Sequence, residues 1–136
     1  MKRYDVVILG SGPAGLTAAL YTSRAKLSTL IVSGPMIGGQ ITQTYQVDNY
    51  PGFPEGITGS ELTMKFKAQA EKFGATFMDS EASAVDFGSQ PYTVTFDGEK
   101  VESRAVIVAT GMTHKKLKIP GEDKLMGRGV FTCATC

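Results

Sequence analysis

The sequence predicts an α/β fold in which helices cover a parallel β-sheet, and three observations indicate it. A near-continuous apolar run, Tyr4–Leu9, is typical of a strand buried on both faces. A glycine-rich turn and a helical pattern follow, and a second apolar run occupies Thr29–Val32. Strand, helix and strand within about thirty residues form a βαβ unit with a right-handed crossover. This start is Rossmann-like.

The predicted first helix begins at Pro13, whose missing N–H costs nothing in a first turn. Its apolar face is formed by Leu16, Ala19, Leu20 and Ser23. After the second strand, the segment Ser33–Ile57 holds five glycines and three prolines without sustained periodicity. A loop of this length inside a domain is usually functional or unstructured.

A second helix is predicted to begin at a capping box, Thr58-Gly59-Ser60-Glu61, and to end at Gly74. Its predicted apolar stripe comprises Leu62, Phe66, Ala70 and Phe73. Ala75–Met78 is then expected to form a further strand.

The next segment predicts a small antiparallel meander over residues 83–103. Tyr92, Val94 and Phe96 alternate with threonines before Asp97-Gly98, a strong hairpin signal. We expect Tyr92, Phe96 and Phe66 to pack in the core. A separate apolar strand is predicted at Ala105–Ala109, closed by Thr110-Gly111. The charged stretch Met112–Met126, with Pro120-Gly121, predicts a linker that leaves the domain.

Size and composition exclude several classes of protein. The 136 residues suffice for one domain with a hydrophobic core. Fourteen Lys and Arg nearly balance 13 Asp and Glu, so we expect no nucleic-acid or membrane partner. Asp5 and several glycines interrupt the pattern of a signal peptide, and no run approaches the roughly 18 apolar residues of a membrane span. We therefore expect a cytoplasmic protein.

The loop Gly10-Ser11-Gly12-Pro13-Ala14-Gly15 lies between a predicted strand and a predicted helix, as a dinucleotide-binding loop requires. Gly10 permits the tight turn, Gly12 admits a pyrophosphate to the backbone, and Gly15 lets the helix pack on the sheet. The helix N-terminus supplies N–H donors to the phosphates. A glycine-rich turn without a ligand is the simpler alternative.

The second strand is followed by Ser33-Gly34 where a ribose-binding acid is expected. No arginine nearby suggests a 2′-phosphate either. The spacing of these residues therefore does not choose between dinucleotides.

The only two cysteines, Cys133 and Cys136, have the spacing of a redox dithiol. In the cytosol such a pair is more often catalytic, redox-sensing or metal-binding than a structural disulfide. His114 is the sole histidine, so one chain cannot supply the four ligands of a structural zinc site, and we expect no metal. Two inert core thiols remain an alternative. His114 itself lies beside Lys115 and Lys116, which is typical of a solvated surface side chain.

Along its whole length the sequence resembles the low-molecular-weight thioredoxin reductases, FAD-dependent pyridine-nucleotide disulfide oxidoreductases. The resemblance rests on ordered motifs: the Gly10–Gly15 loop, Gly38-Gly39-Gln40, Asn49-Tyr50-Pro51-Gly52-Phe53-Pro54, Ala109-Thr110-Gly111 and the Cys133-Ala134-Thr135-Cys136 pair. It implies a Rossmann-like FAD-binding fold, with Gly39, Gln40, Asn49, Thr110 and Gly111 near the flavin. It also implies that Cys136 is the thiol next to the flavin ring and that Cys133 attacks the disulfide of thioredoxin.

In such enzymes, electrons pass from NADPH through FAD to the dithiol and on to thioredoxin. The second glycine-rich loop that the family uses for NADPH, the C-terminal segment that completes its flavin domain, and the acid after its second cysteine are absent from these residues. We therefore expect this chain to be the N-terminal part of a longer, homodimeric enzyme and to be inactive by itself. Residues 1–113 would belong to an incomplete FAD-binding domain, and residues 114–136 would form the linker and the start of an NADPH-binding domain.

Three alternatives stay open from the sequence. One is the flavoprotein component of an alkyl hydroperoxide reductase or a related disulfide reductase. Another, of a different class, is a non-catalytic flavin-binding module with a redox-sensing dithiol. The choice between NADPH and NADH is also open.

Overall fold

The computed structural model describes residues 1–132. Cys133 and Cys136 lie outside the described residues. The elements follow in this order: β1 Lys2–Leu9, α1 Pro13–Arg24, β2 Thr29–Val32, the 3₁₀ helix η1 Gln40–Gln43, α2 Gly59–Lys72, β3 Thr76–Met78, β4 Ala82–Asp86, β5 Tyr92–Phe96, β6 Glu99–Val108 and α3 Glu122–Leu125.

The six strands form one sheet in the order β3-β2-β1-β6-β5-β4. The first four of these run parallel to one another, whereas β5 pairs antiparallel with both β6 and β4. This confirms the predicted α/β fold with a parallel sheet and an antiparallel meander. Because carboxyl ends of parallel strands meet at one edge, Leu9, Val32, Met78 and Val108 end at the same side of the sheet.

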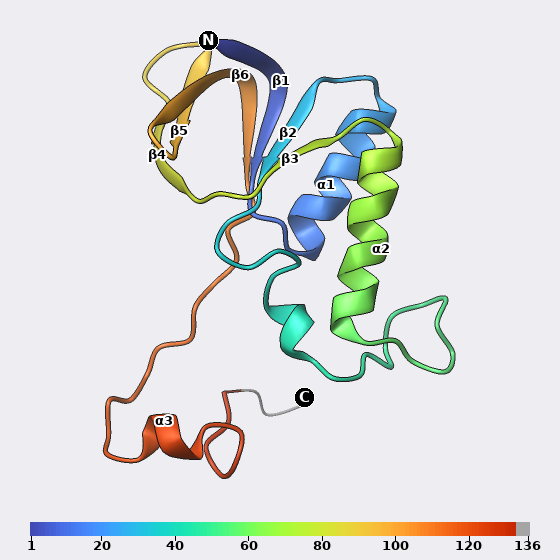
Figure 1. Cartoon of the computed structure of the whole chain (residues 1–136), viewed down its shortest axis with the longest axis vertical. Helices are drawn as coiled ribbons and strands as arrows, with labels where there is room; N and C mark the ends of the chain where they lie inside the picture. Colours follow the sequence, from blue (N-terminus) through green and yellow to red (C-terminus); the bar gives the residue numbers. More distant parts are fainter. Residues whose placement is uncertain (133–136) are drawn as a thin grey trace.

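Helices α1 and α2 lie side by side against one face of the sheet, and its strands β5 and β4 lie away from these helices (Figure 1). The side chains of β1 alternate between the two faces of the sheet, as a strand requires. Val6 and Ile8 pack with Ala19 of α1 and Ala70 of α2, while Val7 and Leu9 belong to the cluster on the opposite face. Both faces of β1 are therefore buried, which explains its continuous apolar sequence.

The predicted capping box and the predicted hairpin turn are both confirmed. Thr58 caps α2: its hydroxyl oxygen accepts from the Glu61 amide at 3.2 Å, and the Glu61 carboxylate accepts from the Thr58 amide. Asp97 and Gly98 have φ angles of 48° and 76°, and two positive φ angles in a two-residue hairpin loop are those of a type I′ turn.

The expected separate strand at Ala105–Ala109 is wrong in its boundary. One continuous strand, β6, runs from Glu99 to Val108. Its first half pairs with β5 (Val94↔Val101), and it pairs with β1 along nearly its whole length (Lys2↔Val101, Leu9↔Val108). The charged residues of its first half hid this continuity in the sequence.

Several smaller expectations need correction. Phe73 lies at the C-cap of α2 and is 37% exposed, so it is not in the helix stripe. Tyr92 and Phe66 are half-buried, whereas Phe96 is buried as predicted. Residues 33–57 contain η1 and a bridge between Val47 and Ile57, which pack with Leu62 of α2. The linker stretch contains α3.

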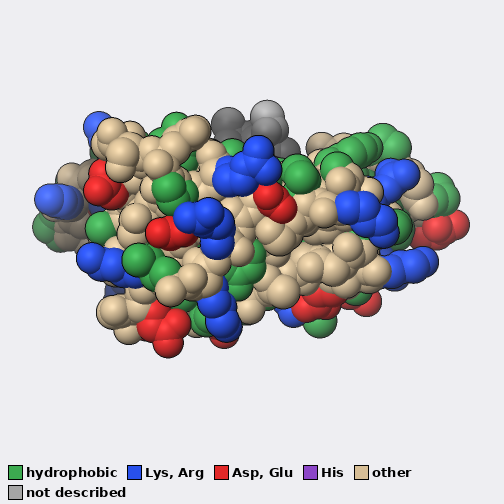
Figure 2. Space-filling model, turned by 90° about the horizontal axis from the view of Figure 1, so that it is seen from above, with side chains coloured by type: hydrophobic (Ala, Val, Ile, Leu, Met, Phe, Trp, Pro, Cys, Tyr) green, Lys and Arg blue, Asp and Glu red, His purple; other side chains and the backbone are tan. Residues whose placement is uncertain are grey.

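The face seen in Figure 2 carries Lys and Arg side chains interspersed with Asp and Glu. No helix within residues 1–132 is long and apolar enough to cross a membrane.

After β6 the chain leaves the sheet as an extended segment that leads to α3 (Figure 1).

Candidate dinucleotide site at the carboxyl edge of the sheet

The glycine-rich loop joins β1 to α1 and contacts the ends of both neighbouring strands. The Gly10 amide donates to the Val32 carbonyl at 2.8 Å. With a φ of +105°, Gly10 adopts a conformation that other residues rarely reach, and a β-carbon there would lie 2.3 Å from the Ala109 carbonyl oxygen. Gly10 is therefore required for the close approach of β1, β2 and β6.

Ser11 fastens the loop to the segment that follows β2. Its buried hydroxyl donates to the Ser33 carbonyl at 2.9 Å, and its own carbonyl accepts from the Gly38 amide at 3.1 Å. The sequence placed Ser11 in the cofactor loop without this role. The structure shows that the side chain is directed into the protein.

The N-terminus of α1 is open. Gly12 is the N-cap, Pro13 follows it in the first turn, no side chain caps the helix, and its first turn holds no acid. A β-carbon on Gly12 would meet nothing closer than the Gly39 Cα at 4.0 Å, and Pro13 and Ala14 are exposed. Free space beside uncapped helical N–H groups fits an anionic diphosphate, because these groups and the helix dipole favour negative charge.

Gly15 has a different role. It is buried, and a β-carbon there would lie 1.9 Å from the Gly10 carbonyl oxygen. The missing side chain lets α1 turn back directly over the loop that precedes it, as the third glycine of the dinucleotide fingerprint does.

Ser33 and Gly34 follow β2 and are joined to the end of β3. The Ser33 amide donates to the Met78 carbonyl at 3.0 Å, and the Gly34 amide donates to the Ser80 carbonyl at 2.9 Å. The Ser33 hydroxyl donates to the Met78 carbonyl at 2.9 Å and lies 3.4 Å from a carboxylate oxygen of Asp79. Asp79 was missed from the sequence, although the rule that parallel strands end at one edge could have indicated it.

Gly39 and Gln40, from the long loop after β2, also contact the carboxyl edge of the sheet. A β-carbon on Gly39 would lie 3.0 Å from the Gly12 Cα, so the two glycines allow the loops to touch. The Gln40 side-chain amide donates to the Met112 carbonyl, which follows the end of β6. Met112 is a second contact that the sequence pattern did not identify.

Thr110 and Gly111 stand at the end of β6. The Ala109 amide donates to the Leu9 carbonyl at 2.8 Å, which holds this segment against β1. The Thr110 Cα would lie 3.2 Å from a β-carbon on Gly10. Thr110 and Gly111 are exposed beside the glycine loop. The structure thus brings the segments 10–15, 33–34, 39–40 and 110–111 to one edge.

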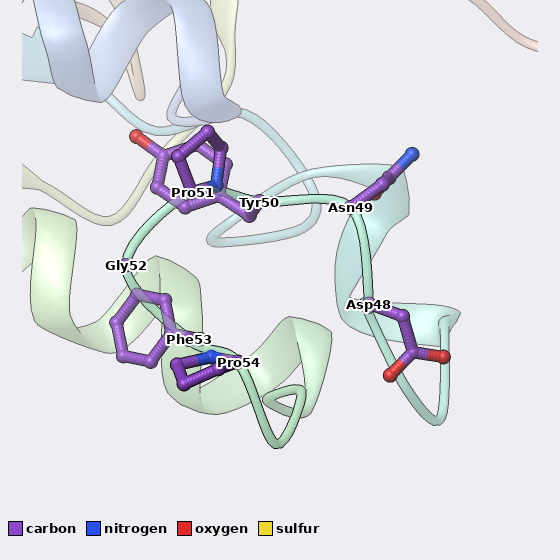
Figure 3. A pocket seen from close by; sticks show the side chains of 7 residues that line it. All are labelled: Asp48, Asn49, Tyr50, Pro51, Gly52, Phe53 and Pro54. Carbon is purple, nitrogen blue, oxygen red and sulfur yellow. The ribbon is translucent and has the colours of Figure 1, made fainter.

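Asn49 lies farther along the long loop, in a hollow of about 310 Å³ lined by residues 48–54. In Figure 3 its amide points away from the rings of Tyr50 and Phe53. Tyr50 packs on Phe66 of α2 with a centroid distance of 5.4 Å, which anchors this part of the loop. Within residues 1–132, no hydrogen bond joins the Asn49 side chain to the glycine loop.

The remaining chemistry-bearing residues lie away from this edge. His114 is exposed in the extended segment. In the part of the chain that the structure describes, no group of three or more His, Cys, Asp or Glu residues could hold a metal ion. Shifted pKa values occur elsewhere: hydrogen bonds from the Ser28 amide and hydroxyl, and from Arg104, lower the pKa of Asp5, and the hydrogen bond to Asp123 raises the pKa of Lys116.

The profile of a family described as "Pyridine nucleotide-disulphide oxidoreductase" matches residues 4–136. The chain belongs to this family. A thioredoxin reductase of Streptomyces coelicolor is 50% identical over 97% of the chain, and a glucosaminate ammonia-lyase of Pseudomonas fluorescens is 45% identical over 100% of it. The solved structure of a thioredoxin reductase from Giardia duodenalis superposes with a TM-score of 0.87 at 34% identity, over 100% of the chain and 44% of that structure.

The family member described here spans 42% of the length of either of these curated relatives. The matched part is the N-terminal part of the family's architecture. The expected resemblance is therefore confirmed, as is the fold that it implied.

Proposed function

We propose that this chain is the flavin-binding N-terminal part of an NADPH-dependent thioredoxin reductase. The observation that carries the proposal is the open space at Gly12, bordered by Gly39 and by the uncapped N-terminus of α1. A diphosphate fits there sterically and electrostatically. The identity with a protein named thioredoxin reductase supports the choice of substrate.

The residues that would hold FAD come from the segments already described. Backbone groups of Gly12, Ala14 and Gly15 would bind the diphosphate, and Gly39, Gln40, Asn49, Thr110 and Gly111 would border the flavin. Gly10, Ser11, Pro13, Ser33 and Gly34 would shape the edge on which these groups stand. When bound, FAD supplies a two-electron carrier that accepts hydride from NADPH and returns the electrons to a disulfide.

The chain's own redox step is thiol–disulfide exchange. The Cys133 thiolate would attack one sulfur of the thioredoxin disulfide, forming a mixed disulfide and releasing the other sulfur as a thiolate. Cys136 would then attack Cys133 in the mixed disulfide, which closes the Cys133–Cys136 disulfide and frees reduced thioredoxin. Two electrons leave the pair, and the released thiolates take up protons from solvent.

We also propose that the flavin domain ends near residue 113 and that a nicotinamide-binding domain begins within residues 114–136. The extended, exposed segment between β6 and α3 supports this boundary. A cytosolic homodimer is the assembly that we expect.

The test uses the full-length protein. Its visible spectrum after purification should show a bound flavin, and NADPH should drive reduction of thioredoxin. Because one relative is named glucosaminate ammonia-lyase, the substrate series includes glucosaminate as well as a peroxiredoxin. Turnover only with one of these two, or no bound flavin, would contradict the proposal.

A variant isolates the dithiol. Cys136→Ser should leave reduction of the flavin by NADPH intact while thioredoxin turnover is lost. His114→Ala, which changes an exposed residue outside the site, is the control and should keep both activities. Persistent thioredoxin turnover in Cys136→Ser would show that the dithiol is not on the electron path.

A further inference from the structure

The corner between the ends of β2 and β3 lacks the acid that a dinucleotide fold usually places directly after its second strand. Ser33 occupies that position. It is only 3% exposed, and its hydroxyl donates to the Met78 carbonyl at 2.9 Å. The Ser33 hydroxyl is uncharged and its oxygen is buried, so it does not offer a solvent-facing acceptor. Ser33 therefore cannot replace a solvent-facing carboxylate.

A carboxylate is nevertheless present at this corner, one strand farther along. Asp79 directly follows β3, and one of its carboxylate oxygens lies 3.4 Å from the Ser33 hydroxyl. Asp79 is exposed, and none of the four ion pairs in residues 1–132 involves it. A carboxylate can accept about four hydrogen bonds, and within residues 1–132 the Asp79 carboxylate has one hydrogen-bonding neighbour, Ser33, so most of its acceptor capacity is unused there.

The space at Gly34, which directly follows Ser33, is open. The Gly34 amide donates to the Ser80 carbonyl, so the backbones on either side of Asp79 and Gly34 are fixed relative to each other. A β-carbon on Gly34 would meet no atom within 4 Å, and its φ of +76° is a conformation natural to glycine. This corner lies at the same sheet edge as the glycine loop, because Ser11 donates to the Ser33 carbonyl.

We propose that Asp79 supplies the acid missing after β2 and accepts hydrogen bonds from the adenosine ribose hydroxyls of the dinucleotide. This inference rests on the proposed FAD site. Ribose hydroxyls are donors and an ionised carboxylate is an acceptor, so the pair is a charge-assisted hydrogen bond. The same charge repels a 2′-phosphate, so the site accepts FAD and disfavours dinucleotides that carry that phosphate.

The experiment measures FAD affinity of the full-length apoprotein by quenching of flavin fluorescence. Asp79→Ala should weaken FAD binding roughly tenfold or more, since a hydrogen bond to a charged group contributes about 1.5–3 kcal/mol. Glu81→Ala removes the same charge from an exposed neighbour and should leave the affinity within about twofold. Circular dichroism establishes that each variant is folded, and Asp79→Asn, with the same shape, replaces Asp79→Ala if that variant does not fold.

An FAD analogue without the two adenosine ribose hydroxyls identifies the contact. It should bind the wild-type protein roughly tenfold more weakly than FAD, while Asp79→Ala should bind the two ligands about equally. If the analogue bound more weakly than FAD by the same factor in the wild-type protein and in Asp79→Ala, the assignment of Asp79 would be overturned. Unchanged FAD affinity in Asp79→Ala would also overturn it. Failure of the wild-type protein to bind FAD would instead overturn the proposed function.

Discussion

The Gly10 carbonyl oxygen lies 1.9 Å from the position that a β-carbon on Gly15 would occupy. The obstructing oxygen belongs to the backbone at the start of the loop, so no flexible side chain can move aside. Gly15→Ala should therefore lower the free energy of unfolding by about 2 kcal/mol, because overpacking outweighs the gain in helix propensity. Urea unfolding measures the effect. An unchanged midpoint would contradict the geometry.

Gly12→Ala is the matched change three residues earlier. Gly12 has a φ of −68°, which alanine adopts easily, and its β-carbon would have no neighbour closer than 4.0 Å. The free energy of unfolding should therefore change by less than about 0.5 kcal/mol.

Substitutions of Gly12 should affect FAD affinity much more than they affect the free energy of unfolding. Gly12→Ala should weaken binding, and Gly12→Val should abolish it, since the side chain would enter the space proposed for the diphosphate. Flavin stoichiometry after purification and fluorescence titration give the two measurements. Full occupancy in Gly12→Val would show that the diphosphate lies elsewhere.

Asp5 makes stability depend on pH. Hydrogen bonds from the Ser28 amide at 2.9 Å and hydroxyl at 2.8 Å stabilise the charged carboxylate and hold the pKa of Asp5 below its ordinary value of 3.8. The stabilisation is thus fully present above about pH 4 and is lost as the pH falls through the lower pKa of the folded state. Asp5→Asn should be less stable than wild type at pH 7, and the difference should shrink in acid. A constant difference in urea midpoints from pH 7 to pH 2.5 would argue against this origin.

Ser23 is a site where a substitution should stabilise the fold. Its hydroxyl is buried in α1 and has no hydrogen-bond partner within the described residues. Ser23→Ala removes the unpaired group and improves helix propensity, so the free energy of unfolding should rise by about 1 kcal/mol. Thr63→Ala in α2 is the contrast, because the Thr63 hydroxyl donates to the Gly59 carbonyl at 3.1 Å and should cost stability when removed. If Ser23→Ala proved destabilising, the Ser23 hydroxyl would have a hydrogen-bond partner after all, most simply a bound water.

Local signals in the sequence predicted most of the fold. The capping box at Thr58, the Asp97-Gly98 turn and the buried strand Thr29–Val32 each depend on a few neighbouring residues, and each has the predicted structure. The boundary of β6 could not be predicted in this way. The polar first half pairs with both β1 and β5 and forms part of the meander, whereas the apolar second half pairs with β1 alone among the described strands, so the two halves differ in composition.

The site was only partly predictable for a related reason. The glycine loop is contiguous in the sequence, so its role followed from its flanking elements. The contacts of Ser33 with Asp79 and of Gln40 with Met112 join residues 46 and 72 positions apart. Such pairs depend on strand order, and no short pattern contains that information.

The double pairing of β6 also affects how the protein opens. Since one strand carries hydrogen bonds to β1 on one side and to β5 on the other, the meander cannot detach without freeing backbone groups of the strand that backs the glycine loop. Amide protons of β1 and β5 should therefore exchange with solvent at a common free energy, as a single cooperative unit.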